Sequence, residues 1–306
     1  MITILLAAYN GERYLAEQID SILAQTEKNW RLVIQDDCST DRTVALAQCY
    51  ADSYPDHIRL VRQSTPSGTS KNNFFSMLRY VDTEYWMTCD QDDIWLPNKV
   101  EVTLRAMRRL EEEDYGVPLL VHTDLTVIDQ SRNILAKSLF GYQKLDSKRD
   151  SFANLLSQNI VTGCTALMNR ALLERVGPIP AAALMHDWWF ALIAAAFGKI
   201  AFVAQPTVLY RQHGGNSVGA KRAGFFYLAK KALKSEETKT ALESTYVQAQ
   251  CFFNYYEKDL PESLSDICRN FIALPQLNKM QRIQCLHQFD FWKSGTARKI
   301  GQLFFI

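Results

Sequence analysis

Short apolar segments alternate with segments of helical spacing along the first 90 residues, and this alternation restricts the possible fold more than any other feature. Residues 2–8 form an apolar run that ends at the turn signal Tyr9-Asn10-Gly11. Further strands are expected at 31–34, 58–61 and 85–88, and helices at 12–24, 41–52 (capped by Ser39 or Thr40) and 70–81. This order predicts an α/β fold, a doubly wound, mainly parallel sheet with right-handed crossovers.

Polar side chains follow three of these strands at the point where each strand ends. They are Tyr9-Asn10, Asp36-Asp37 and the run Asp90-Gln91-Asp92-Asp93. The carboxyl ends of parallel strands meet at one edge of a sheet, and ligands bind in the crevice outside them. The sequence therefore predicts a ligand site at this edge.

The pattern changes in the second half of the chain. A charged helix is expected from 97 to 113, strands at 118–122, 125–129 and 162–168, and helices at 151–158 and 186–197, the latter stopped by Gly198. Short strands at 200–204 and 207–210 are separated by Pro206. From about residue 220 the pattern is helical. We therefore expect a catalytic α/β domain at 1–219 and a helical C-terminal extension at 220–306.

Charge and cysteine content restrict the class of protein. The net charge of +1 over 306 residues argues against a nucleic-acid binder that relies on bulk electrostatics. The seven cysteines form no CxxC pair, which is typical of reduced thiols in the cytosol. Residues 1–8 are too short for a signal peptide or a membrane span. The sequence thus predicts a cytoplasmic protein.

The acidic run 90–93 is a candidate metal site. Carboxylates this close repel one another unless a cation compensates them. Their oxygens suit Mg²⁺ or Mn²⁺, which bridge to phosphate oxygens and neutralise a diphosphate leaving group. The alternative is a solvated loop or a helix cap before Trp95-Leu96-Pro97.

Three other polar positions have both a structural and a functional interpretation. Asp36-Asp37 could accept hydrogen bonds from a pyrimidine N–H or a ribose hydroxyl, or cap a helix. Asp187 either stabilises the start of an apolar helix or acts as a general base. His213, beside Arg211 and a Gly-Gly-Asn loop, is either structural or a ligand of a metal or diphosphate. The chain contains neither GxGxxG nor GxxxxGK[ST], so a bound nucleotide would need a metal and carboxylates.

Taken together, these motifs resemble the family-2 inverting glycosyltransferases. The first 215 or so residues are similar to the GT-A domain of that family, with motifs at residues 8–12, 36–39, 90–93 and 186–188. The segments DQDDIWLPNK (90–99), HTDL (122–125), VTGC (161–164), MHDW (185–188) and YRQH (210–213) look most like bacterial rhamnosyltransferases of cell-wall or O-antigen synthesis.

The resemblance implies a role for each matching position in the donor site. Ala8, Tyr9 and Glu12 would line the base pocket, Asp36 would contact the pyrimidine, Asp90 the ribose, and Asp92 the metal, while Gln91, Lys71 and Asn72 would touch the donor. His213 would meet the metal or the diphosphate, and Asp187 would be the catalytic base. Asp93 would contact the sugar or cap the following turn. Where the family often has glycine after the paired aspartates, this chain has Cys38.

The resemblance also implies the reaction and its partners. The donor would be dTDP-β-L-rhamnose and the acceptor a lipid-linked saccharide. A UDP-sugar donor on the same fold, or a nucleotide-sugar-binding module without catalysis, are the alternatives.

The extension carries 13 Lys/Arg against 8 Asp/Glu and mixes them with aromatic residues at 224–234 and 289–305. It therefore predicts either peripheral contact with the inner face of the cell membrane, or packing on the core or on a second subunit of a homodimer.

Overall fold

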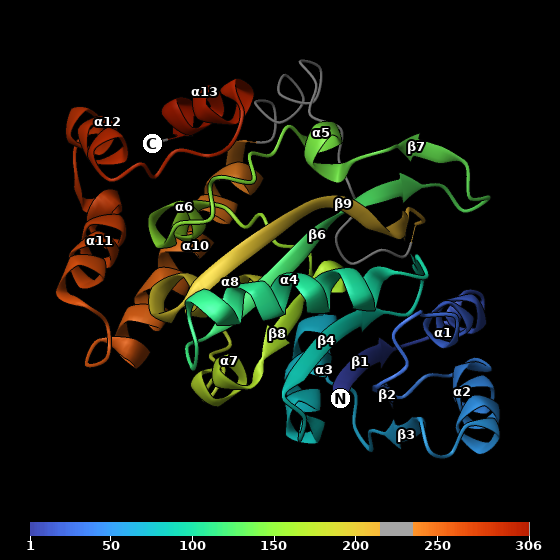
Figure 1. The fold of residues 1–306 in the computed structure, drawn as a ribbon. Coiled ribbons are helices and arrows are strands. Elements are labelled where there is room, and N and C mark those ends of the chain that lie inside the picture. Colours follow the sequence, from blue (N-terminus) through green and yellow to red (C-terminus); the bar gives the residue numbers. More distant parts are fainter. Residues whose placement is uncertain (215–234, 306) are drawn as a thin grey trace.

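The computed structural model describes residues 1–214 and 235–305 (Figure 1). Its first part alternates as expected: β1 (Ile2–Ala8), α1 (Leu15–Leu23), β2 (Trp30–Asp36), α2 (Thr43–Ser53), β3 (Ile58–Arg62), α3 (Ser70–Met77) and β4 (Tyr85–Asp90). β1 lies between β2 and β4, and β3 pairs with β2, all in parallel register. The carboxyl ends of β1, β2 and β4 therefore lie side by side.

The remaining strands make the sheet mixed. Its order is β3-β2-β1-β4-β8-β6-β9-β5, and β7 (Ile134–Ala136) pairs with β6. β8 (Leu167–Asn169) is antiparallel to β4 and to β6 (Leu119–Ile128), β6 and β9 (Lys199–Arg211) are parallel, and β5 (Ile94–Trp95) is antiparallel to β9. The carboxyl ends of β1, β2 and β4 thus come from the parallel half of the sheet. β5, which follows β4 along the chain, pairs with β9 and so places the end of β9 beside these carboxyl ends.

Several predicted boundaries were wrong for physical reasons. The strands expected at 118–122 and 125–129 are one strand, β6, and those at 200–204 and 207–210 are one strand, β9. Pro206 is tolerated because it pairs with Asp124 where the register shifts, and a bulge does not need its missing N–H. Residues 163–165 form a 3₁₀ turn before the short β8, so the strand expected at 162–168 is mostly absent.

Helices were predicted more accurately than their caps. α4 (Lys99–Glu113), α6 (Phe152–Ser157) and α8 (His186–Phe197) match the expected spans. The cap expected for α2 at Ser39 or Thr40 was wrong, because the carboxylate of Asp41 accepts the hydrogen bond from the Thr43 N–H at 2.9 Å. α1 begins at Leu15 rather than at residue 12, since the intervening residues form the turn after β1.

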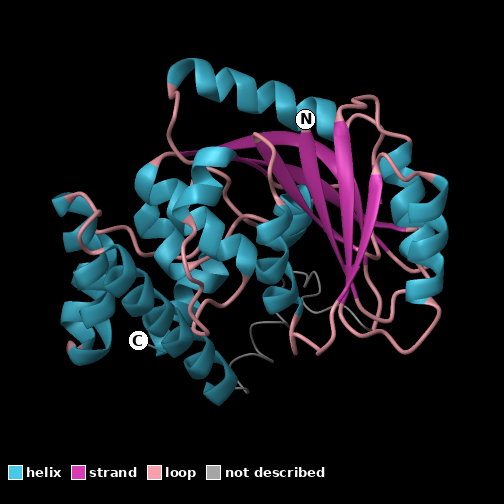
Figure 2. Cartoon of the chain, turned by 90° about the horizontal axis from the view of Figure 1, so that it is seen from below, coloured by secondary structure: helices cyan, strands magenta, loops and turns pink. Residues whose placement is uncertain are grey.

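Helices cover both faces of the sheet (Figure 2). One apolar core packs α1, α2 and α4 against the sheet. The other lies under α3, α6 and α8, and it continues into the C-terminal helices, which are α10 (Ser235–Tyr256), α11 (Glu262–Ala273), α12 (Lys279–Gln288) and α13 (Thr296–Phe305). Phe252 of α10 contacts Trp189 of α8 and Phe152 of α6, with ring centroids 5.3 and 5.4 Å apart. The extension and the sheet domain therefore share a core.

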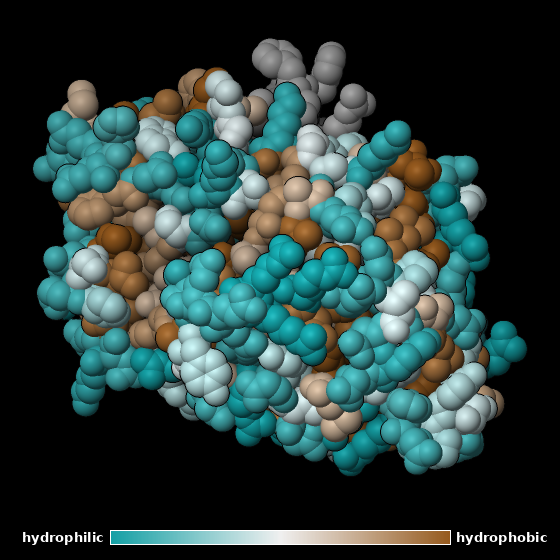
Figure 3. Space-filling model, in the orientation of Figure 1, coloured by the Kyte–Doolittle hydropathy of each residue, from teal (hydrophilic) through white to brown (hydrophobic). Residues whose placement is uncertain are grey.

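Hydrogen bonds of polar side chains also join the extension to the sheet domain. The Arg149 guanidinium donates to the carboxylate of Asp290 at 3.1 Å and to its carbonyl at 2.9 Å, and Asn154 donates to the same carbonyl at 2.8 Å. Within the described residues, every helix is too short or too polar to cross a membrane. The face in Figure 3 is largely hydrophilic, with apolar atoms in separate patches that include the region of the C-terminal helices.

Candidate active site

The ends of β1, β2 and β4 are tied together by hydrogen bonds. The Gln91 side-chain amide accepts from the Tyr9 N–H and donates to the Tyr9 carbonyl, both at 2.9 Å. The Asn10 N–H donates to the Ser39 hydroxyl at 2.9 Å, and the Ala8 carbonyl accepts from the Asp37 N–H at 2.8 Å. The predicted convergence of the three polar clusters is confirmed.

Two residues in these turns adopt the left-handed backbone region. Asn10 has φ of 46° and Cys38 has φ of 63°. Cys38 occupies the position where the resemblance leads us to expect glycine, and glycine alone enters this region without a side-chain penalty. The Cys38 thiol donates to the Gln63 carbonyl at 3.3 Å. Cysteine is thus accommodated with its side chain bound to the neighbouring loop.

The paired aspartates after β2 have separate roles. Asp37 accepts from the N–H and the hydroxyl of Ser67, both at 2.6 Å, and so holds the loop before α3. Asp36 is 2% exposed; one carboxylate oxygen accepts from the Ser39 N–H at 3.1 Å, and the other has no partner among the described residues. A buried oxygen without a partner is costly, which makes Asp36 the member of the pair that is suited to a ligand N–H.

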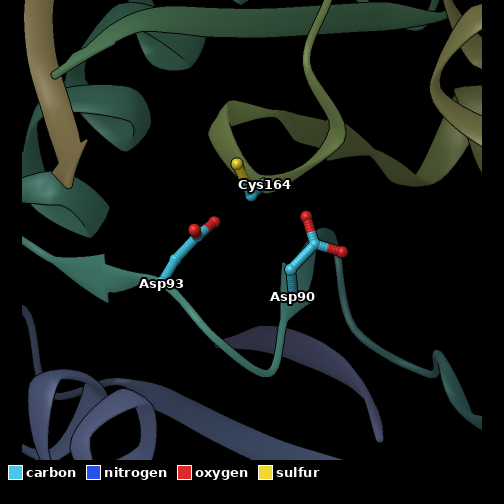
Figure 4. A group of neighbouring side chains, drawn as sticks. All are labelled: Asp90, Asp93 and Cys164. Atoms are coloured by element: carbon cyan, nitrogen blue, oxygen red, sulfur yellow. The ribbon is translucent and has the colours of Figure 1, made fainter. Parts of the chain in front are cut away.

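The aspartates of the acidic run 90–93 also differ from one another in burial and in their hydrogen-bond partners. Asp93 is fully buried, and one of its oxygens accepts from the Arg211 N–H at 3.1 Å. Burial, and then Asp92 and Asp90, raise the pKa of Asp93 well above its usual range. Asp90 is the last residue of β4 and Asp93 lies in the turn before β5, and ligand atoms of these two residues and of the buried Cys164 lie within 4.8 Å of one another (Figure 4). A buried thiol with a raised pKa is a poor ligand for Mg²⁺.

Asp92 and His213 form the better candidate for a metal. His213 Nε2 lies 2.6 Å from Asp92 Oδ2, and these side chains are 15% and 13% exposed. A carboxylate and an imidazole suit Mn²⁺. Adjacent ligands of an octahedral ion with bonds of about 2.1 Å are about 3 Å apart, so these two atoms already lie near the spacing that one ion would need. The predicted metal pair is therefore close enough in space to share one ion.

Arg211 contacts the backbone of Asp92 and so supports the Asp92–His213 pair. It is 1% exposed, and its guanidinium donates to the Asp92 carbonyl at 3.0 Å and pairs with Glu17 of α1. The guanidinium lies 4.7 Å from the centre of the Tyr14 ring, and the centres of the Tyr14 and His213 rings are 5.0 Å apart. β9, α1 and the acidic turn are thus joined through one buried cation.

Asp187 lies in the first turn of α8 and is partly buried. Its oxygens accept from the Asn159 side-chain amide and the Gly163 N–H, both at 3.0 Å. Burial raises the pKa of Asp187 to about 6. Burial, Asp92 and Asp187 raise that of Asp90 to about 7, so Asp90 lies within electrostatic reach of both groups. A partly exposed carboxylate with a raised pKa has the properties of a general base.

The other predicted donor residues lie at the same edge but already have protein partners. Lys71 donates to the carbonyls of Ala181 and Ala183 at 2.9 and 2.5 Å, and Asn72 donates to the Ser67 carbonyl at 2.9 Å. Glu12 accepts from the Arg42 N–H at 2.9 Å. Tyr9 is 54% exposed, whereas Ala8 is fully buried in the core. Their contacts with a donor stay predictions.

Sequence reasoning assigned no role to Lys99 or to Asn159. Lys99 is fully buried; its ammonium lies 4.1 Å from the centre of the Trp95 ring, and burial lowers its pKa to about 8. It neighbours Asp93 and the thiols of Cys89 and Cys164. A lysine in the first turn of an amphipathic helix is usually exposed, so the only signal was its place at the end of the DQDDIWLPNK segment.

The HTDL segment has a structural role. One oxygen of Asp124 accepts from the N–H groups of Leu125 and Leu139 at 2.8 and 3.0 Å, and the other from the Ser138 hydroxyl at 2.5 Å. These bonds fix the start of α5 (Leu139–Gln143) over β6. His122 is fully buried between the Phe140 and Phe202 rings, and burial lowers its pKa to about 3, so it is neutral.

The chain is similar in sequence to curated bacterial glycosyltransferases. The chain is 28% identical over 228 residues to the dTDP-rhamnosyl transferase RfbG of Shigella flexneri, covering 70% of this chain and 74% of that protein. It spans 52% of the length of two further curated relatives.

Solved structures share the fold. The TarS protein of S. aureus in complex with UDP-GlcNAc superimposes with a TM-score of 0.57 at 18% identity, over 94% of this chain and 80% of that one. The mannosyltransferase PcManGT from Pyrobaculum calidifontis, in complex with GDP-Man and Mn²⁺, gives 0.53 at 18% identity, over 98% and 78%. The fold is the expected GT-A fold with a helical C-terminal region.

The sequence model of glycosyl transferase family 2 matches residues 3–177. The match includes the ends of β1, β2 and β4 and the residues Asn159 and Gly163 that donate to Asp187, whereas Asp187 itself lies beyond it. More than half of the chain is matched, and the chain belongs to glycosyl transferase family 2.

Proposed function

We propose that this glycosyltransferase transfers L-rhamnose from dTDP-β-L-rhamnose, with inversion, to a hydroxyl of a lipid-linked saccharide. The observation that carries the proposal is the arrangement of carboxylates at one sheet edge. Asp92 and His213 form a pair suited to Mn²⁺ or Mg²⁺, and Asp187 is a separate, partly buried carboxylate with a raised pKa. Glycosyl transfer needs these two functions, one for the leaving diphosphate and one for the attacking hydroxyl.

In this mechanism the hydroxyl oxygen of the acceptor attacks the anomeric carbon, and Asp187 takes the proton of that hydroxyl. The bond from that carbon to the diphosphate oxygen breaks on the opposite side, and dTDP leaves with the bonding electron pair. A metal ion on Asp92 and His213 would neutralise the diphosphate. Asp36 would accept the N3–H of the base, and Asp90 would face the pentose. The reaction needs no covalent intermediate on the protein.

The rhamnosyl donor rests on RfbG, whose printed activity is dTDP-rhamnosyl transfer. UDP-sugars are the alternative donor, because TarS binds UDP-GlcNAc on a similar fold. Thymine and uracil present the same N3–H, so Asp36 does not distinguish them. The pentose does distinguish them, since dTDP lacks the 2′-hydroxyl of UDP. A donor panel that includes both nucleotides with several sugars decides between these candidates.

The base assignment is tested with Asp187→Asn. We expect at least a hundredfold loss of transfer, with donor affinity retained, because the amide cannot accept the proton. A folded Asp187→Asn enzyme that transfers at the wild-type rate would rule out the assignment. Tight donor binding by the wild-type protein without turnover over many acceptors would favour a non-catalytic binding module.

Peripheral membrane contact stays a proposal. The basic aromatic segment 224–234 lies outside the described residues, whereas within 289–305 the Phe291 ring is buried and Phe304 is 76% exposed. Co-sedimentation with vesicles of anionic lipid, compared with vesicles of neutral lipid, tests the contact. Absence of binding to both vesicles would rule it out, and light scattering of the protein without vesicles would report a homodimer.

A further inference from the structure

The segment 159–163 connects the strand of the acidic run to Asp187. The Thr88 hydroxyl of β4 donates to the Gly163 carbonyl at 2.8 Å, and the Gly163 N–H donates to Asp187. A β-carbon at Gly163 would come within 2.6 Å of His186 Nε2, so the backbone packs directly against the start of α8. This segment therefore sets where the Asp187 carboxylate lies relative to the donor edge of the sheet.

Asn159 supplies the other hydrogen bond to Asp187, and its orientation is fixed. The side-chain oxygen of Asn159 accepts from the Val161 N–H at 2.9 Å, while its NH₂ group donates to the Val161 carbonyl at 2.9 Å and to Asp187 at 3.0 Å. Val161 presents one donor and one acceptor, so a flipped amide would lose both bonds. The Asn159 NH₂ group must therefore face Asp187.

We propose that Asn159 is the positioning residue of the catalytic base, and that its amide both orients the Asp187 carboxylate and holds it in the ionised state. The proposal rests on the function assigned to Asp187 above. The hydrogen bond favours the charged form and opposes the effect of burial, which raises the pKa of Asp187. Asp90 at the end of β4 interacts electrostatically with Asp187, and burial lowers the pKa of the adjacent His186 to about 3, so that ring is neutral.

The proposal is tested by titrating the Asp187 carboxyl carbon by ¹³C NMR, assigned by its absence from Asp187→Asn. Asn159→Asp keeps the size of the side chain and the bond to the Val161 N–H, but turns an oxygen toward Asp187. Two adjacent carboxyl groups share a proton, so the pair should lose its last proton at least one pH unit higher than wild-type Asp187 does. Asn159→Ala, which only removes the donor, should shift the midpoint in the same direction by less.

Asn270→Asp is the matched control. Asn270 also donates to a backbone carbonyl, that of Asp266 at 2.8 Å, but lies on α11 in the extension. This variant should titrate at Asp187 like the wild type. An unchanged Asp187 midpoint in both folded Asn159 variants would overturn the proposal, and the smaller change in Asn159→Ala decides if Asn159→Asp does not fold.

Activity separates this proposal from the proposed function. Hydrolysis of dTDP-β-L-rhamnose with Mn²⁺ uses water as the acceptor, and the water also loses a proton. At pH 6 the rate of Asn159→Asp should fall about fivefold or more, because a one-unit rise from a pKa of about 6 leaves about a tenth of the base ionised. The rate of Asn159→Ala should fall by less, and both rates should recover toward pH 9, with unchanged affinity for dTDP. An equal loss at every pH would indicate a purely structural role and overturn the proposal. A shifted NMR midpoint with full activity in Asp187→Asn would contradict only the base assignment.

Discussion

Neighbouring aspartates of this chain differ in burial and partners, and these differences decide what each can do. Asp37 is saturated by Ser67, whereas Asp36 keeps an oxygen without a partner. Asp93 is buried against the Arg211 backbone, whereas Asp92 faces His213. The sequence predicted that these pairs matter, but the division within each pair depends on loops and strands distant in the chain.

The pH dependence of transfer is predicted from Asp187. Because burial raises its pKa to about 6, the base is protonated below that pH and ionised above it. The transfer rate should rise about tenfold per unit up to pH 6 and level off above it. Measurement of kcat from pH 4.5 to 9 checks this, with circular dichroism to verify folding. A rate that is flat from pH 4.5 to 7 would contradict it.

Cys38 provides a second test at this scale. Its φ of 63° is easy for glycine and hard for a β-branched residue. Cys38→Gly should keep activity and change stability by less than about 1 kcal/mol, while Cys38→Val should lose about 1–2 kcal/mol. Thermal melting measures both variants. Equal stability of the two would show that the backbone here is not restricted.

At the scale of the elements, the apolar periodicity of the sequence predicted most strands and helices, because each of them buries apolar side chains against the rest of the protein. α8 ends at Gly198 as expected, but the reason is not a left-handed cap, because its φ is −165°. A β-carbon there would lie 1.8 Å from the Pro118 carbonyl oxygen. Such tertiary contacts, like the bulge that lets Pro206 continue β9, leave no signal in a short sequence window.

Gly198→Ala should therefore destabilise the protein by about 2–3 kcal/mol through overpacking of backbone against backbone. Gly301→Ala is the matched control, because nothing lies within 4 Å of its added carbon and it is in α13. Alanine in that helix should stabilise by about 0.5–1 kcal/mol. Chemical denaturation measures both free energies of unfolding, and a neutral Gly198→Ala would contradict the close approach.

Buried charge within elements was the hardest feature to predict. A lysine in the first turn of a charged helix is usually exposed, yet Lys99 is fully buried beside Trp95. Asn159 has no pattern of its own, since its function depends on Val161 and on Asp187, which is 28 residues away. The resemblance identified the motif residues. The residues that contact and orient these motif residues are known only from the structure, as with Asn159 and Asp187.

At the scale of the whole molecule, the C-terminal helices are part of the core. The predicted boundary near residue 219 lies within the segment that the structure does not describe, and it stays a prediction. The rings of Phe252, Trp189 and Phe152 pack across it, and Arg149 binds Asp290. The extension therefore stabilises α6 and α8, and α8 carries Asp187.

Phe252→Ala should lower the free energy of unfolding by about 3–5 kcal/mol, because it leaves a cavity between α6, α8 and α10. Phe304→Ala, at a ring that is 76% exposed, should change it by less than about 0.5 kcal/mol. Urea denaturation of both variants makes the comparison. Similar stability of the two would contradict a stabilising contact of the Phe252 ring with α6 and α8.

The central claim is that the edge of the sheet binds a nucleotide sugar through a metal ion on Asp92. A thermal-shift panel of dTDP- and UDP-sugars, with Mn²⁺ and with EDTA, tests it most directly. Donor at about 100 times its Kd should add about 2.7 kcal/mol, a rise of about 5 °C in Tm. We predict this rise for dTDP-β-L-rhamnose with Mn²⁺, and its loss in EDTA and in Asp92→Ala. The same shift without metal or in Asp92→Ala, or no shift with any donor, would contradict the claim.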